Sequence, residues 1–182
     1  MDKNEIRRMY RQKRDKVDEG SKQAADAAIL TQLYELDEYL AAKEIFVYVS
    51  YGSEADTRGI IADAFKRKKR VAVPKIVGKA EMQFLWIDGF SDLKPNKLGI
   101  LEPVCVNAAL PPNGALFIVP GLVFSEGMDR VGYGGGFYDA YLTGLDVVKV
   151  GLCYEFQVVK RLLCEPHDVK MNYIITDKNR LM

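Results

Sequence analysis

Histidine, tryptophan and cysteine are scarce in this chain of 182 residues, which has one histidine (His167), one tryptophan and three cysteines. A single histidine excludes metal centres that need several imidazole ligands, and it argues against Ser-His-Asp or Cys-His catalysis. The cysteines, Cys105, Cys153 and Cys164, lack C-x-x-C spacing, and one must stay unpaired in any disulfide scheme. We therefore expect free thiols, and a chemistry that depends on bound phosphate, hard cations and electrostatics.

The chain also lacks an excess of charge of either sign and a long apolar run. Its 26 Lys and Arg side chains nearly balance 25 Asp and Glu, so that the net charge is +1. Nothing in this balance calls for nucleic acid or a membrane as a partner. No run approaches the roughly 18 apolar residues of a membrane span, and the first residues, MDKNEIRR, lack a signal-peptide core. We expect a cytoplasmic protein, monomeric, with a dimer as the alternative.

One run of five consecutive cations, residues 66–70, is the strongest local concentration of charge. Nucleic-acid binding is one interpretation of such a run. However, it closes a predicted helix, where cations complement the helix dipole and stay hydrated, and it has no interleaved aromatic residues. We interpret it as a solvated helix end.

Apolar periodicity predicts alternating strands and helices. The length predicts a single domain over residues 1–182 that buries roughly 70% of its unfolded surface. The pattern indicates a three-layer α/β/α protein around a mainly parallel sheet. An apolar stripe on the second helix is expected from Ala25 through Leu36 to Leu40, interrupted or bent near Asp37, and Thr57 is expected to cap a later helix. The expected strands are 45–49, 71–74, 82–87, 115–119, 149–154 and 173–176, and the expected helices include 3–17 and 155–163.

The stretch 119–142 is rich in glycine and is expected to join a strand to a helix. Glycines let the backbone turn tightly and approach a ligand closely, and free N–H groups at a helix start favour an anion such as phosphate. Arg130 precedes the densest glycines as a forked donor, and Asp139 follows them in the first helical turn. The stretch matches neither the P-loop nor the G-x-G-x-x-G fingerprint. A flexible hairpin or linker is the alternative.

The residues of this stretch carry a family resemblance. P-G-L-V-F followed by R-V-G-Y-G-G-G-F-Y-D-A-Y-L resembles the signature of the 5-formyltetrahydrofolate cyclo-ligase family. Further segments agree in order along nearly the whole chain: K-N-E-I-R at 3–7, E-A-D-T at 54–57, G-I-L-E-P at 99–103 and E-P-H-D-V at 165–169. The resemblance implies ATP- and Mg²⁺-dependent cyclisation of 5-formyltetrahydrofolate to 5,10-methenyltetrahydrofolate, with release of ADP and phosphate.

The resemblance also assigns roles to residues. It implies two metal ligands, Asp139 and Asp168, which suit magnesium because that ion completes its shell with water and nucleotide phosphates. His167 receives no role. Implied ATP contacts are Lys3, Asn4, Glu5, Ile6, Arg7, Arg130, Val131, Gly132, Tyr133, Gly134, Gly135, Gly136, Phe137 and Tyr138. Implied folate contacts are Val49, Glu54, Tyr133, Gly134, Gly135, Gly136 and Phe137.

The residue types fit that chemistry independently of the resemblance. Lys3 and Arg7 lie one helical turn apart, so with Arg130 they supply cations for a polyphosphate, whose transfer needs mainly positioning and charge neutralisation. No general base is evident. Phe137 stands where the family commonly has Tyr, and Tyr133 stands where some members have Arg.

Two other functions stay open. One is a different phosphate-binding enzyme on a similar sheet, of the sugar-phosphate isomerase type. The other is a nucleotide-binding regulator that has lost the chemistry.

Overall fold

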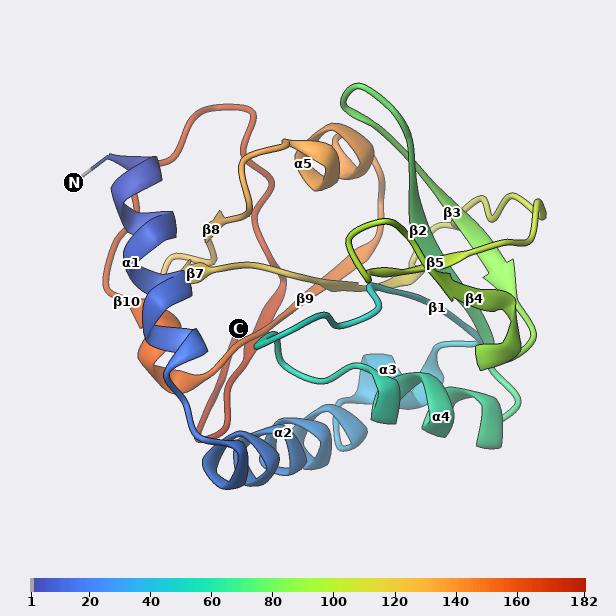
Figure 1. Cartoon of the computed structure of the whole chain (residues 1–182), viewed down its shortest axis with the longest axis horizontal. Helices are drawn as coiled ribbons and strands as arrows, with labels where there is room; N and C mark the ends of the chain where they lie inside the picture. Colours follow the sequence, from blue (N-terminus) through green and yellow to red (C-terminus); the bar gives the residue numbers. More distant parts are fainter. Residues whose placement is uncertain (1) are drawn as a thin grey trace.

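The computed structural model describes residues 2–182 and is built around a seven-stranded sheet in the order β12-β11-β9-β6-β1-β2-β3 (Figure 1). Strands β2, β1, β6, β9 and β11 pair in parallel, and an antiparallel strand closes each edge. The mainly parallel sheet is therefore confirmed. Its strands are β1 (Glu44–Val47), β2 (Arg70–Gly78), β3 (Glu81–Ile87), β6 (Leu116–Val119), β9 (Val148–Leu152), β11 (Tyr173–Ile175) and β12 (Arg180–Leu181).

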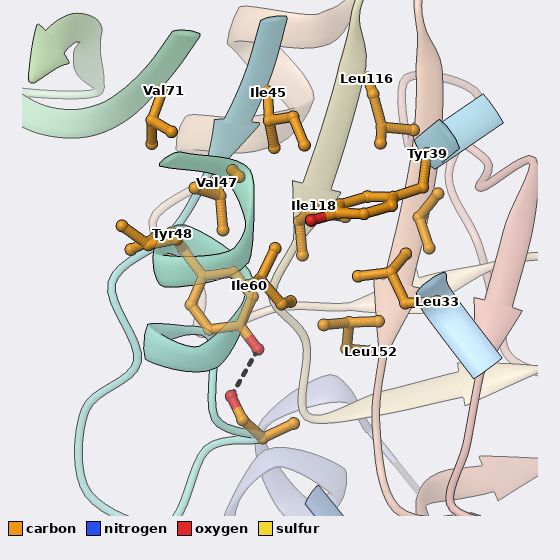
Figure 2. Packing of buried hydrophobic residues seen from close by; sticks show 14 of the residues in the cluster. Leu33, Tyr39, Ile45, Val47, Tyr48, Ile60, Val71, Leu116, Ile118 and Leu152 are labelled. Carbon is orange, nitrogen blue, oxygen red and sulfur yellow. Dashed lines mark hydrogen bonds between the residues drawn. The ribbon is translucent and has the colours of Figure 1, made fainter. Parts of the chain in front are cut away.

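Helices cover both faces of this sheet. In Figure 1, α2 (Glu19–Tyr34), α3 (Asp37–Ala41) and α4 (Arg58–Lys66) lie below it, and α5 (Phe137–Leu142) lies above. Successive side chains of β1 alternate between the two faces, as strand geometry requires. Ile45 and Val47 join one buried cluster, shown with Tyr39 and Ile60 in Figure 2, whereas Phe46 joins the other. Both faces are thus apolar, as expected of a parallel sheet.

The second cluster is rich in aromatic rings. Phe46 stacks on Phe117 with 4.5 Å between ring centroids, and Phe84 meets both rings edge-on. Because the three phenylalanines come from β1, β6 and β3, this contact fixes distant strands of the sheet against each other.

The first helix, α1 (Lys3–Asp15), covers neither face but lies beside the sheet (Figure 1). It begins at Asp2 with a capping box. Its apolar residues pack, with Tyr10 buried among Leu122, Val123 and Val131, on a small sheet of β7 (Val123–Ser125), β8 (Arg130–Val131) and β10 (Val158–Val159). The remaining elements are the hairpin β4 (Leu93–Pro95) and β5 (Leu101–Pro103) and the short 3-10 turns Phe90–Asp92 and Glu155–Gln157.

Several sequence-based boundaries are wrong. The expected helix 155–163 is a 3-10 turn followed by β10, because Val158 and Val159 pair with β7. The strand expected at 71–74 continues to Gly78, since β3 pairs along its length. A strand follows β11, so that the segment at 173–176 is not the last. Leu40, expected in the buried stripe, is 47% exposed because the second helix ends at Tyr34 and α3 starts afresh.

The basic run at 66–70 is only partly a solvated helix end. Lys69 is buried, and its ammonium group donates to the main-chain carbonyls of Tyr39, Leu40 and Ala42 at 2.5 to 3.1 Å. These carbonyls lie at the end of α3, where cations complement the helix dipole. Lys69 therefore ties α3 to the start of β2, a role that the sequence pattern did not indicate.

Replacing Lys69 by methionine should lower the free energy of unfolding by about 2 kcal/mol, because the carbonyls at the end of α3 lose a charged donor in a buried site. Urea unfolding followed by circular dichroism measures this loss. Lys66→Met, at an exposed position of the same run, is the control and should change stability by less than about 0.5 kcal/mol. Equal effects of the two substitutions would contradict the assignment.

Candidate active site

An open cavity of about 1140 Å³ lies between α1 and the loops that follow the parallel strands. Open α/β sheets bind ligands at this carboxyl edge. The cavity is lined by the loop after β1, the loop before β5, the glycine-rich residues 132–136, the start of α5 and residues 165–168. Segments that are far apart in the sequence, including both ends of the chain, therefore meet at one site.

The sequence suggested that the glycine-rich stretch runs directly from a strand to a helix. In the structure it does not. After β6 the chain first forms the β7–β8 hairpin, and only then do residues 132–136 lead into α5. Gly136 adopts φ 66° at the N-cap of α5, and a Cβ on Gly132 would lie 2.5 Å from a guanidinium nitrogen of Arg130. Glycine thus avoids backbone strain at Gly136 and leaves room for the Arg130 side chain at Gly132.

Arg130 is a buried cation that faces this cavity. Its side chain is 4% exposed, and it donates to Asp139 Oδ2 at 2.9 Å and to the carbonyl of Pro120 at 3.2 Å. Among the described residues, its Nε has no hydrogen-bond partner. Asp139 in turn accepts from the backbone N–H of Val169 at 3.1 Å. A buried guanidinium needs such a carboxylate, and its remaining donors suit an anionic ligand.

Lys3 and Asp168 form a second ion pair on the cavity wall, with Nζ and Oδ2 separated by 2.8 Å. Partial burial opposes ionisation of Asp168, but the backbone N–H of Glu165 and the Lys3 ammonium together lower its pKa below the ordinary value. The same hydrogen bond raises the pKa of Lys3. Both groups are therefore charged at neutral pH, and the pair joins α1 to the loop after β10.

Arg7 attaches α1 to the glycine-rich residues. Its Nε donates to the carbonyl of Gly132 at 3.0 Å, and a terminal nitrogen donates to Asn4 Oδ1 at 2.7 Å. Asn4, Glu5 and Ile6 do not line the cavity: Glu5 belongs to the capping box, and Ile6 packs under the helix. These three residues make other contacts in the structure, and their role as ATP contacts stays a prediction.

Glu54 lies in the loop after β1 with both carboxylate oxygens engaged. One accepts from the backbone N–H of Tyr51 at 2.8 Å, and the other accepts from the Tyr133 hydroxyl at 2.5 Å. The loop is also fixed by a buried hydrogen bond. The Tyr48 hydroxyl donates to the carbonyl of Ala55, as drawn in Figure 2. The site carboxylate is therefore fixed before any ligand arrives.

Thr57 stands at the N-cap of α4, but its side chain does not cap the helix as expected. Its hydroxyl donates instead to the carbonyl of Tyr48, and Asp56 accepts from the N–H groups of Arg58 and Gly59. Thr57 thus fixes the loop after β1, while Asp56 accepts hydrogen bonds from the free N–H groups at the start of α4.

The other predicted contacts also line the cavity. Tyr133 and Phe137 present ring surface, and the Tyr138 hydroxyl is buried without a partner among the described residues. The sequence did not indicate Arg11, Arg14 and Ser53, nor Ile76 and Met82 of an apolar wall, whereas Leu98 and Ile100 of the same wall adjoin or belong to the G-I-L-E-P segment that the family resemblance singled out. The wall comes from the β2–β3 hairpin and the loop before β5, which only tertiary folding brings here.

Cavity residues predicted from the sequence are Lys3, Arg7, Val49, Glu54, Arg130, Val131, Gly132, Tyr133, Gly134, Gly135, Gly136, Phe137, Tyr138, Asp139 and Asp168.

The carboxylates of Asp139 and Asp168 have the chemistry that magnesium prefers, and both line the cavity. Both hydrogen bonds that Asp168 accepts from described residues end on Oδ2, which leaves Oδ1 for a ligand. Within residues 2–182, the group of three metal-ligating side chains whose ligand atoms lie within 4.8 Å of one another is Glu165, His167 and Asp168, and it does not include Asp139. Of the two predicted ligands, Asp168 therefore has a free carboxylate oxygen, whereas both oxygens of Asp139 already accept hydrogen bonds, from Arg130 and from the N–H of Val169.

The three cysteines are free thiols, as expected, with Cys153 buried and Cys164 exposed. Over residues 2–182, the structure contains no helix with the length and apolar character needed to cross a bilayer.

A mainly parallel α/β sheet with a cation-lined cavity at its carboxyl edge defines the class of phosphate-handling α/β enzymes. Comparison with known proteins narrows this class. The sequence model of the 5-formyltetrahydrofolate cyclo-ligase family matches residues 1–177. The chain belongs to this family.

Named relatives and a solved structure support the same family assignment. The 5-formyltetrahydrofolate cyclo-ligase of Escherichia coli is 29% identical over 92% of this chain and 96% of its own length. The probable 5-formyltetrahydrofolate cyclo-ligase of Schizosaccharomyces pombe is 28% identical over 96% and 94%. The solved structure of Aquifex aeolicus 5,10-methenyltetrahydrofolate synthetase superposes with a TM-score of 0.87 at 28% identity, covering 100% of this chain and 92% of that one. The sequence-based family and fold predictions are confirmed.

The Lys3–Asp168 pair predicts a measurable titration. Substituting Lys3 by methionine should raise the pKa of Asp168, because the carboxylate loses its ammonium donor. Carboxyl-carbon NMR over an acid titration measures this pKa. Since the folded-state pKa of Asp168 is lowered in the wild type, the stability that the pair contributes is present above the unfolded-state pKa. It is lost as pH falls through the lowered value. An unchanged Asp168 pKa in the variant would contradict the pairing.

Proposed function

We propose that this chain catalyses the ATP-dependent cyclisation of 5-formyltetrahydrofolate to 5,10-methenyltetrahydrofolate. The observation that carries the proposal is one cavity that joins a cationic wall, made by Lys3, Arg7 and Arg130, to a fixed carboxylate, Glu54. The cations suit a nucleotide polyphosphate, and the carboxylate suits the N–H and amino donors of a pterin ring. Family membership supports this reaction over a sugar-phosphate isomerase or a non-catalytic regulator.

The reaction proceeds by transfer of a phosphoryl group. The oxygen of the N5-formyl group attacks the γ-phosphorus of ATP, the bond to the β-phosphate oxygen breaks, and ADP leaves. N10 then attacks the activated formyl carbon and loses its proton to the departing phosphate or to solvent. The carbon–oxygen bond breaks, and the oxygen departs with inorganic phosphate. N10 is the nucleophile, so the protein's task is to position the reactants and to stabilise developing charge.

Each part of the cavity has a role in these steps. Arg130, held by Asp139, and the cations of α1 stabilise the transferred phosphoryl group. Tyr133 and Phe137 provide flat surface for the folate rings. Asp139 and Asp168 would hold a magnesium ion, which supplies charge neutralisation on the phosphates when bound. We also propose a cytoplasmic monomer, and the near-neutral net charge gives no reason to expect a nucleic-acid or membrane partner.

Absorbance of the methenyl product tests the proposal, with 5-formyltetrahydrofolate, ATP and magnesium present and each omitted in turn. Product that requires all three supports the proposed reaction. Nucleotide binding without product would favour a regulator, and binding of a sugar phosphate without folate binding would favour another phosphate enzyme. Either result would contradict the proposal.

Asp139→Asn should lower kcat about 100-fold or more, because Arg130 loses the charge that holds it and the cavity loses a metal-binding carboxylate. Initial rates of methenyl formation measure the effect, and circular dichroism verifies the fold. Lys66→Met, outside the cavity, should keep the wild-type rate. A fully active, folded Asp139→Asn variant would remove Asp139 from the proposed mechanism.

A further inference from the structure

Arg14 is a buried cation in the last turn of α1 with no role in the reaction described so far. It is 6% exposed, although arginine is almost never buried without a partner. Its Nε donates to Ser53 Oγ at 3.1 Å, and a terminal nitrogen donates to the Tyr133 hydroxyl at 2.9 Å. The guanidinium also lies over the Tyr133 ring, 5.7 Å from its centroid. Arg14 thus donates hydrogen bonds to two loops of the cavity, the loop after β1 and the glycine-rich residues 132–136.

The hydrogen bonds from Arg14 continue to Glu54 in a fixed direction. Arginine can only donate and an ionised carboxylate can only accept, so the Tyr133 hydroxyl must accept from Arg14 and donate to Glu54. The distances are 2.9 Å and 2.5 Å. Burial, together with the neighbouring Glu54 carboxylate, raises the pKa of Tyr133, which keeps its hydroxyl protonated and able to donate.

The second carboxylate oxygen of Glu54 is held separately, by the backbone N–H of Tyr51 at 2.8 Å. With one donor on each oxygen, the carboxylate has a single orientation, and its remaining lone pairs are available to the cavity that it lines. The Tyr51 contact is local, whereas the Tyr133 contact comes from the glycine-rich loop. The loop contact depends on Arg14, because no other hydrogen bond of the described residues orients the Tyr133 hydroxyl.

We propose that Arg14 is a positioning residue that orients Glu54 toward the folate through the Tyr133 hydroxyl. The relay is Arg14 to Tyr133 to Glu54, and it rests on the proposed function. It places the control of folate binding on the same helix that carries Lys3 and Arg7, but at its other end. Loss of Arg14 should therefore weaken folate binding and leave nucleotide binding nearly intact.

Calorimetric titration of four variants tests the relay, with 5-formyltetrahydrofolate and a non-hydrolysable ATP analogue titrated separately. Arg14→Met and Tyr133→Phe should each raise the Kd for folate about tenfold, and Arg14→Met should keep the Kd for nucleotide within about twofold. The double variant should bind folate no more weakly than either single variant, since both substitutions break the same relay. Arg14→Lys should recover part of the affinity, because lysine still donates to the hydroxyl.

The matched control is Arg8→Met, on the same helix but exposed and outside the cavity lining. It should change neither Kd. Tyr133→Phe keeps the ring and leaves Arg14 in place, so the test survives even if Arg14→Met does not fold. Additive effects in the double variant, an equal loss of both ligands, or unchanged folate binding would overturn the relay. Absence of folate binding by the wild-type chain would instead overturn the proposed function.

Discussion

The attachment of α1 to the loops of the sheet is the contact on which the rest of the site depends. The helix is rich in cations and covers neither face of the sheet, so its own helix propensity does not fix its place. Its place is set by a small apolar cluster around Tyr10 and by polar contacts of three cations. Lys3 pairs with Asp168, Arg7 bonds to Gly132, and Arg14 bonds to Tyr133. Without this helix, the cavity would lose one wall and most of its positive charge.

Two cations of the site are paired with carboxylates before a ligand arrives. Arg130 has Asp139, and Lys3 has Asp168, so that each carboxylate offsets part of the cost of removing the cation from water. An incoming polyphosphate then either displaces these carboxylates or binds beside them. In both cases the cationic donors are already oriented. This is preorganisation in the electrostatic sense, because the donors do not need to reorganise as charge develops on the phosphoryl group.

The sequence predicted the features that depend on local pattern. The β-branched runs gave the central strands, and the spacing of Lys3 and Arg7 indicated that both side chains share one face of a helix. Arg14 was missed because it looks like any cation of an amphipathic helix until Tyr133 and Ser53 approach it in the folded chain. The helix expected at 155–163 failed for a similar reason, since pairing of Val158 and Val159 with β7 is a long-range contact that overrides local periodicity.

In the proposed mechanism, the formyl oxygen is phosphorylated and leaves as part of phosphate. To test this step, 5-formyltetrahydrofolate labelled with ¹⁸O in the formyl group is supplied together with ATP and magnesium, and the released phosphate is analysed by mass spectrometry. Transfer through the formyl oxygen predicts one ¹⁸O atom in each inorganic phosphate formed with the methenyl product. Unlabelled phosphate, with the ¹⁸O recovered in water, would contradict it.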